Sequence, residues 1–281
     1  TITLYDDDDQ IELTQTRVDL ETDGRHAIVA HDQDWARDAA RRDFTINALY
    51  LGSSGSIFDP LGGKADLEAG RLRFAGDAGL RVQEDALRML RYCRFLPRFD
   101  ATGIDPHAQT ALRKHASLCA GLSGERIANE MRRIMVGSGL KEAIGLMQDS
   151  KIDQAALGLS LDPSRLANDD EIGSMIAGLG GNVDFAWLAN LAVAMPSGSA
   201  VLLAKRLRLS RAEERCLTRL DLGFGTEDMT VLSGARWRQA VYYLGDMAAL
   251  LLALQSWRNG QFALASRLAY SSAWPRRKTH F

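Results

Sequence analysis

The sequence has few of the residues that hold a fold together through covalent bonds or metal ions. Its three cysteines, Cys93, Cys119 and Cys216, lie far apart, form no CxxC pair and have no cluster of histidines beside them. This spacing excludes a disulfide framework and a zinc finger, and it fits the reducing cytoplasm, where we expect the protein. The longest apolar run, residues 247–254, is too short to cross a bilayer, and no secretory signal peptide is visible.

The sequence also has little excess charge. Its 34 basic and 36 acidic residues leave a formal net charge of −2, so the chain as a whole exerts no general attraction on nucleic acid. A basic surface must therefore be local, and the arginines between residues 81 and 98 could form one. A chain of 281 residues is long enough for two or three modules.

The first twenty residues predict two strands, residues 1–4 and 11–20, joined by the acidic segment 5–10. The four aspartates of this segment could hold a metal ion, but an exposed acidic turn is the better interpretation because neighbouring like charges repel each other. Glu12 falls on the polar face of the second strand. A carboxylate at that place could help to hold a divalent cation, or it could simply be solvated.

A loop and a helix are predicted next. The Asp23–Gly24 pair marks residues 22–27 as a loop, which also carries Arg25 and His26 within reach of a ligand. Residues 34–51 are mostly helical in pattern.

Within this helical pattern, Asp43 and Asn47 are four residues apart and would share one helix face. Such a pair could read ribose hydroxyls while Arg42 meets a phosphate. The alternative is a surface arginine pair with a capping aspartate.

Residues 84–95 predict a helix with two distinct sides. The apolar side comprises Met89, Leu90, Cys93 and Leu96, and the polar side comprises Glu84, Asp85, Arg88, Arg91 and Arg94. Asp85 and Arg88 would stand one turn apart and offer donors and acceptors in one plane.

This pair suits the Watson–Crick edge of cytosine or adenine, where an amine lies next to an unprotonated ring nitrogen. Uracil and guanine place a carbonyl there, which a carboxylate repels. Arg91 and Arg94 would then be left to bind phosphates. The alternative is a solvated arginine-rich face with an ordinary ion pair.

The remaining pattern predicts an α+β protein whose strands all lie in the first 75 residues. Short extended segments are expected at 57–58 and 71–74, on either side of a turn at 59–63. Helices are expected at 107–115 and 124–136 and throughout the rest of the chain, including a capping box at 210–213. Four aromatic residues in the later apolar stripes are expected to pack between helices rather than stack on bases: Trp187, Trp237, Tyr242 and Trp257.

Three segments together are specific in order and spacing: residues 41–48, 59–67 and 84–95. They closely resemble the class II tRNA nucleotidyltransferases, which are the CCA-adding enzymes, and the related bacterial poly(A) polymerases. Residues 12–14 and 23–27 look like the third-carboxylate strand and the flexible loop of that family, and residues 125–130 look like its later helical motif. The resemblance covers roughly residues 1–134. It implies a partial nucleotidyltransferase head at 1–75, a helical neck at 76–136 and a helical, RNA-binding body at 137–281.

The resemblance also implies an activity, which is the addition of C, C and A to tRNA 3′ ends from CTP and ATP with Mg²⁺ and no nucleic-acid template. By the same resemblance, Glu12 would be the catalytic, metal-supporting carboxylate. Asp85 and Arg88 would act as the amino-acid template. The other nucleotide-binding residues would be Arg42, Asp43, Asn47, Arg91 and Arg94, and the loop residues Asp23, Arg25 and His26 would help the switch from C to A.

One departure from the family is marked. The family places a Gly-Gly phosphate loop and an Asp-x-Asp metal pair before the strand that holds Glu12, and residues 1–11 contain neither. The first residue is Thr1 rather than a methionine. We therefore expect an internal fragment, cut at both ends, that is inactive by itself. Two alternatives stay open, a bacterial poly(A) polymerase and a non-catalytic RNA-binding relative that kept the fold.

Overall fold

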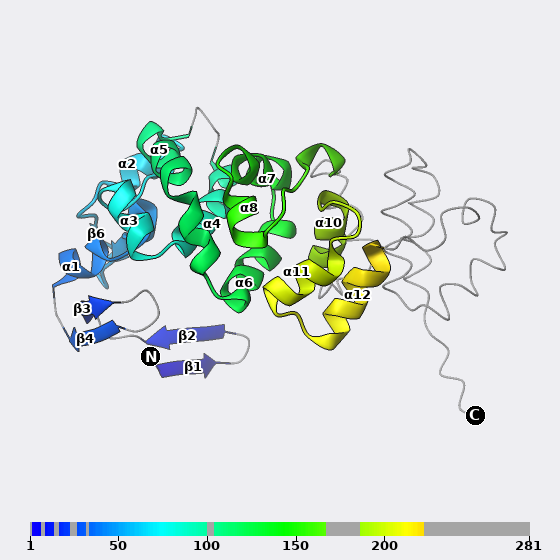
Figure 1. Cartoon of the computed structure of the whole chain (residues 1–281). Coiled ribbons are helices and arrows are strands. Elements are labelled where there is room, and N and C mark those ends of the chain that lie inside the picture. The colour runs from blue at the N-terminus through cyan, green and yellow to red at the C-terminus, as the bar shows by residue number, and fades with distance from the viewer. Residues whose placement is uncertain are drawn as a thin grey trace, which may run out of the picture. The chain divides into compact units, whose positions relative to one another are not determined.

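The computed structural model describes residues 2–6, 9–13, 17–22, 27–31, 34–99, 104–166 and 186–221. The chain divides into two compact units, Thr1–His115 and Ala116–Phe281. All described strands belong to the first unit and the described part of the second unit is helical, which confirms the α+β class (Figure 1). The predicted division into head, neck and body at residues 75 and 136 stays a prediction.

Two antiparallel hairpins begin the chain. Strand β1 (Ile2–Asp6) pairs with β2 (Asp9–Leu13), and β3 (Arg17–Thr22) pairs with β4 (Ala27–His31). The prediction of one strand over residues 11–20 was wrong, because that segment is divided between β2 and β3, and β4 was not expected at all. The break has a signal in the sequence. The apolar residues stand at odd positions, 11 and 13, before it and at even positions, 18 and 20, after it, so one strand could not keep them on one face.

The predicted helix over residues 34–51 is shorter than expected. Helix α1 (Trp35–Ala40) is capped by Asp34, whose Oδ1 accepts from the backbone N–H of Ala36 at 2.9 Å. After α1 come a 3₁₀ turn, η1 (Thr45–Asn47), and a small hairpin of β5 (Tyr50–Leu51) and β6 (Ile57–Phe58).

The helix cannot continue because Phe44 is extended, at φ −125° and ψ 152°, and bridges to Phe74. The predicted strand at 57–58 and the extended segment at 71–74 are both confirmed.

The turn at residues 59–63 leads into helix α2 (Gly63–Glu68). The Asp59 carboxylate accepts from the backbone N–H of Gly63 at 2.8 Å and of Lys64 at 3.0 Å, so it caps the helix. A Cβ atom on Gly63 would lie 2.2 Å from the carbonyl oxygen of Thr45. Gly63 therefore allows α2 to pack closely on η1. The N–H groups of Gly63 and Lys64, which a phosphate would use, are occupied by Asp59.

Three helices complete the first unit, namely α3 (Ala78–Glu84), α4 (Leu87–Phe95, followed by the 3₁₀ turn η2, Leu96–Arg98) and α5 (Pro106–His115). The predicted apolar side of α4 is buried as expected. Its Tyr92 ring stacks on Phe74 with centroids 5.2 Å apart, and Phe44 lies 5.3 Å from Phe74. This aromatic core fixes α4 against the segment that follows α1.

The second unit packs helices around a buried apolar core. Its described elements are η3 (Ala116–Gly121), α6 (Gly124–Met135), α7 (Leu140–Asp149), α8 (Ile152–Leu157), η4 (Pro163–Arg165), α10 (Ala186–Ala194), α11 (Ala200–Leu207) and α12 (Arg211–Asp221).

The capping box that begins α12 is confirmed, since the Ser210 N–H donates to Glu213 at 2.9 Å and the Glu213 N–H donates to Ser210 at 3.3 Å. Trp187 is buried, as predicted, while Trp237, Tyr242 and Trp257 lie outside the described residues.

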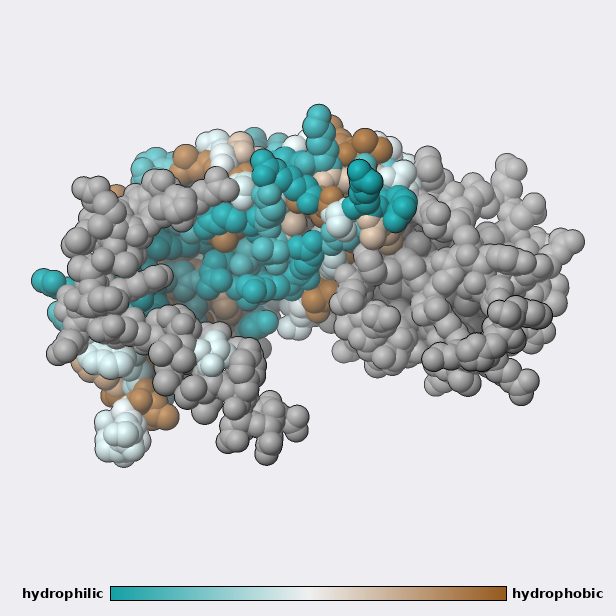
Figure 2. All heavy atoms as spheres, turned by 90° about the horizontal axis from the view of Figure 1, so that it is seen from below, coloured by the Kyte–Doolittle hydropathy of each residue, from teal (hydrophilic) through white to brown (hydrophobic). Residues whose placement is uncertain are grey.

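The described surface is mostly hydrophilic on the face seen in Figure 2, with small separate apolar areas. Among the described helices, none has the length and hydropathy needed to span a bilayer.

Candidate nucleotide-binding site

Asp43, which follows α1, is the centre of the candidate site. Arg91 of α4 donates from its Nε to Asp43 Oδ2 at 2.6 Å, and Asn47 donates from its Nδ2 to Asp43 Oδ1 at 2.9 Å. The structure therefore brings together three predicted nucleotide-binding residues, one of them 48 positions away in the chain. The Asp43–Asn47 contact is formed as expected, although the two residues do not lie on one regular α-helix.

The environment of Asp43 keeps its carboxyl group ionised. Burial alone would raise its pKa, but the hydrogen bond from Asn47 and the charge of Arg91 outweigh burial and hold the pKa below its ordinary value. The Phe44 N–H adds a further hydrogen bond to Oδ1 at 3.0 Å. An ionised, oriented carboxylate is the group that a ribose hydroxyl would donate to.

A second carboxylate, Asp38 of α1, was missed in the sequence. Its side chain is almost fully buried, and it accepts from Arg42 Nη2 at 2.9 Å, Arg41 Nε at 2.8 Å and the Tyr50 hydroxyl at 2.8 Å. Burial opposes ionisation, yet these three donors lower the pKa of Asp38. Burial, helped by the hydrogen bond to Asp38, raises the pKa of Tyr50 to about 12. The i,i+3 and i,i+4 spacing of Asp38 to the two arginines was the available signal.

Arg42 is thus held along one edge and open along the rest. Its side chain is 42 % exposed, and its guanidinium carbon lies 5.7 Å from the centroid of the Tyr50 ring. A guanidinium that is oriented by a buried carboxylate and an aromatic ring is prepared for an anion such as a phosphate.

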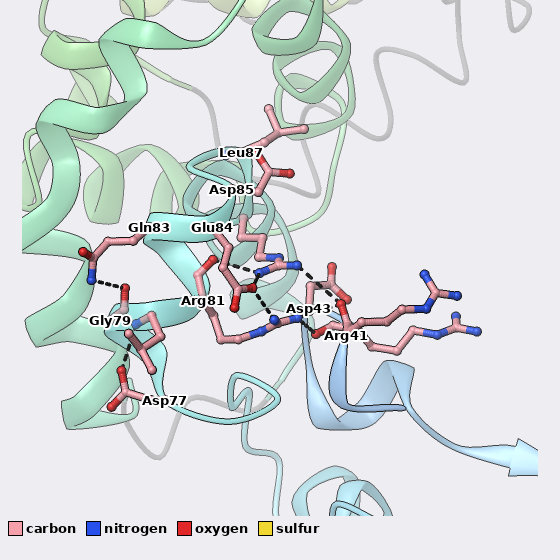
Figure 3. Close-up of polar contacts among 12 residues, drawn as sticks. Arg41, Asp43, Asp77, Gly79, Arg81, Gln83, Glu84, Asp85 and Leu87 are labelled. Atoms are coloured by element: carbon pink, nitrogen blue, oxygen red, sulfur yellow. Dashed lines mark hydrogen bonds and ion pairs between the residues drawn. The ribbon is translucent and has the colours of Figure 1, made fainter. Parts of the chain in front are cut away.

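The arginine predicted to read the base, Arg88, contacts Glu84 in the structure. Its Nη1 donates to Glu84 Oε2 at 2.7 Å and to the Arg81 carbonyl at 2.9 Å. Glu84 also pairs with the Arg81 guanidinium, which in turn donates to the Arg41 carbonyl at 2.6 Å and the Arg42 carbonyl at 2.5 Å (Figure 3). The end of α3 is therefore joined to the end of α1 through backbone carbonyls.

The prediction of one continuous helix over residues 84–95 was wrong. Helix α3 ends at Glu84, Asp85 is extended at φ −150° and ψ 105°, and α4 begins at Leu87. The Asp85 Oδ1 accepts from the Leu87 N–H at 3.1 Å, and its carboxylate is turned toward Leu87 and away from Glu84 in Figure 3.

Aspartate favours such local bonds to backbone N–H groups over a place inside a helix, and this preference is the physical reason for the break. Asp85 and Arg88 are still joined at the start of α4, where the Arg88 N–H donates to the Asp85 carbonyl at 3.1 Å.

Two family models match the chain. The model described as "Poly A polymerase head domain" matches residues 1–73, and the model described as "Probable RNA and SrmB- binding site of polymerase A" matches residues 103–156. Residues 1–73 and 103–156 of the chain therefore resemble the family of CCA-adding enzymes and poly(A) polymerases. The resemblance seen in the sequence is thereby confirmed.

Curated proteins that match the chain agree with this resemblance. The chain is 45 % identical over 151 residues to the human CCA tRNA nucleotidyltransferase 1, mitochondrial, a match that covers 53 % of this chain and 35 % of the human protein. It is 36 % identical over 166 residues to the CCA-adding enzyme of Bacillus pumilus, and this match covers 58 % of this chain and 41 % of the Bacillus protein. This chain therefore spans only about two fifths or less of the length of these relatives.

A solved structure shares the fold of this chain. The Bacillus stearothermophilus CCA-adding enzyme in complex with CTP matches with a TM-score of 0.67 and 20 % identity, over 96 % of this chain and 66 % of that one.

Some predicted residues lie where the structure says little about them. Glu12 belongs to β2, where its backbone pairs with that of Thr3, and its side chain is not described. Asp23, Arg25 and His26 lie outside the described residues. In the part of the chain that the structure describes, no three His, Cys, Asp or Glu residues gather closely enough to hold a metal ion. The described residues thus bring Asp43, Asn47 and Arg91 together but do not by themselves form a metal site.

Proposed function

We propose that the protein is a tRNA nucleotidyltransferase that adds CCA to tRNA 3′ ends from CTP and ATP. The observation that carries this proposal is the contact of Arg91 with Asp43, because it joins the arginine helix α4 to the segment that holds Arg42. Groups suited to a phosphate, a ribose and a base are thereby collected in one compact unit. The names of the relatives support the choice of reaction.

Each part of a nucleotide would have a partner in this arrangement. Arg42 would receive the triphosphate, Asp43 and Asn47 would receive the ribose hydroxyls, and Arg91 with Arg94 would hold the bound nucleotide. The Asp43–Arg91 pair keeps the carboxylate oriented before a ligand arrives, which reduces the ordering that binding must supply.

The base would be selected by Asp85 and Arg88. A guanidinium has five N–H donors, and three hydrogen bonds occupy Arg88, namely those to Glu84, to the Arg81 carbonyl and, at 3.4 Å, to the Arg41 carbonyl. Two donors remain for a ring nitrogen, while the Asp85 carboxylate would accept from the exocyclic amine. Cytosine and adenine satisfy both groups.

The reaction class requires metal ions, and we infer that the ion is Mg²⁺ because it binds phosphate and carboxylate oxygens. Glu12 would supply one carboxylate ligand. The other ligands would come from outside the described residues.

We also place the protein in the cytoplasm on the strength of its few, separated cysteines, although the human relative is named as mitochondrial.

An incorporation assay tests the function. Full-length protein, radiolabelled CTP and ATP, Mg²⁺ and a tRNA that lacks CCA should give a product that stops after three additions. Long tails made from ATP alone would make the protein a poly(A) polymerase. Tight RNA binding with no incorporation would make it a non-catalytic relative.

A further inference from the structure

Three arginines gather around one aromatic ring at the end of α4. The guanidinium carbons of Arg91, Arg94 and Arg98 lie 5.7, 4.2 and 5.4 Å from the centroid of the Phe95 ring. The ring is itself fixed, since it packs edge-on against the fully buried Phe44 with centroids 5.6 Å apart. The guanidiniums therefore lie on a platform that is anchored in the aromatic core of the first unit.

The three guanidiniums differ in their surroundings. Arg91 carries the ion pair with Asp43 and belongs to the proposed nucleotide site. Arg98 is an exposed residue of η2, seven positions further along the chain. The platform thus has one guanidinium in the proposed nucleotide site and another on an exposed residue.

We infer that Arg98 binds a phosphodiester group of the RNA strand that receives the nucleotide. A guanidinium that lies over an aromatic ring is partly dehydrated, keeps a fixed plane and presents a fork that matches phosphate oxygens. The proposal rests on the proposed function, because the acceptor RNA must reach the bound nucleotide.

Phosphate could also come from the nucleotide itself. The triphosphate already has Arg42 as its proposed partner, on the segment that carries Asp43, whereas Arg98 is an exposed residue of η2. The end of an RNA strand that approaches the nucleotide would bring its backbone phosphates to that exposed position. We therefore assign the acceptor RNA, and not the triphosphate, to Arg98.

The salt dependence of tRNA binding measures this contact. Dissociation constants of the purified chain for a fluorescent tRNA without CCA are measured over a series of salt concentrations. Each phosphate contact to a single strand contributes about 0.7 to the slope of log K against log salt. Arg98→Ala should reduce the slope by about 0.7. Arg98→Lys, which keeps the charge, should keep the slope.

A matched control is Lys64→Ala, because the Lys64 side chain on α2 is 59 % exposed. Removal of this cation should leave the slope unchanged. CTP affinity, measured on the same variants by equilibrium dialysis, separates the two sources of phosphate. Weaker CTP binding by Arg98→Ala with an unchanged tRNA slope would overturn the proposal in favour of the triphosphate. An unchanged slope and unchanged CTP affinity would overturn it outright, as would a chain that binds no tRNA.

The outcome is distinguishable from that of the proposed function. If the slopes change as expected while full-length protein incorporates no CMP, the RNA contact stands and the enzymatic proposal fails. If CMP is incorporated while Arg98→Ala keeps the wild-type slope, only the RNA contact is refuted. Circular dichroism of each variant confirms that the helices have folded.

Discussion

Asp43→Asn removes the charge from the ion pair that joins α4 to the segment after α1. The side chains of Arg91 and Asp43 are 28 % and 11 % exposed, and their closest N–O distance is 2.5 Å. A hydrogen bond to a charged group contributes about 1.5–3 kcal/mol to stability. Because the pair is only partly buried, we expect a coupling energy of about 2 kcal/mol, which lies within that range.

A double-mutant cycle measures this coupling directly. Urea unfolding of wild type, Asp43→Asn, Arg91→Gln and the double variant should show that the double variant loses little more stability than either single variant. The affinity for CTP should fall about tenfold or more in each single variant, since about 1.4 kcal/mol corresponds to a factor of ten. The same cycle on Lys64 and Glu68, an exposed pair at 3.8 Å, supplies the control and should give a coupling of about 0.5 kcal/mol or less.

Two results would refute the reasoning. A coupling energy between Asp43 and Arg91 that is no larger than that of the control pair would mean that their contact is incidental. Unchanged CTP affinity in a folded Asp43→Asn variant would exclude this carboxylate from ribose recognition.

Further predictions concern the base, the loop, the packing of α2 and acid stability. In the full-length protein, Asp85→Ala should lose discrimination against UTP and GTP by about 1–3 kcal/mol, roughly ten- to a hundredfold; incorporation assays with each nucleotide measure it, and unchanged selectivity contradicts the templating role. Replacement of residues 23–26 by a Gly/Ser linker should spare C addition more than A addition, and equal loss of both steps on a sequencing gel would indicate a folding defect instead. Gly63→Ala should cost about 1–3 kcal/mol of unfolding free energy, because its Cβ would lie 2.2 Å from a carbonyl oxygen of η1, whereas Gly145→Ala, with nothing within 4 Å, should cost nothing in urea unfolding. Since the folded-state pKa of Asp43 is lowered, its stabilising contribution is complete above the unfolded pKa of about 3.9 and is lost as the pH falls through the folded value. Asp43→Asn should therefore flatten the fall of stability below about pH 4, and an acid-unfolding curve parallel to that of wild type would contradict this.

Periodic apolar residues and local spacing predicted much of this structure. The buried side of α4, the contact of Asp43 with Asn47 and the capping box at Ser210 all depend on residues within a few positions of each other. Side chains at such spacing meet for reasons of local geometry, and the sequence shows that spacing directly. The extended segment at 71–74 was visible for the same reason.

What the sequence did not reveal depends on the backbone or on distant partners. Arg81 donates to the carbonyl oxygens of residues 41 and 42. Every residue has a backbone carbonyl, so the residue types at those positions do not show that these carbonyls accept hydrogen bonds. The helix break at Asp85 follows from a choice between two local hydrogen-bonding patterns that differ little in free energy. Arg91 finds Asp43 only because the aromatic core packs α4 against that segment, and no periodicity encodes that packing.

The break at Asp85 has a mechanical consequence. A carboxylate and a guanidinium on one regular helix would keep a constant separation, since moving them apart would mean unwinding a turn. Here two residues, the extended Asp85 and then Ala86, lie between two rigid rods, α3 and α4. Rotation about the ψ torsion of Asp85 changes the gap between the Asp85 and Arg88 side chains while both helices stay intact, and it breaks the hydrogen bond from the Leu87 N–H to the Asp85 carboxylate. Under the proposed function, a site that takes a one-ring pyrimidine and then a two-ring purine would gain from such a joint, because the gap between the two side chains could be adjusted at one residue.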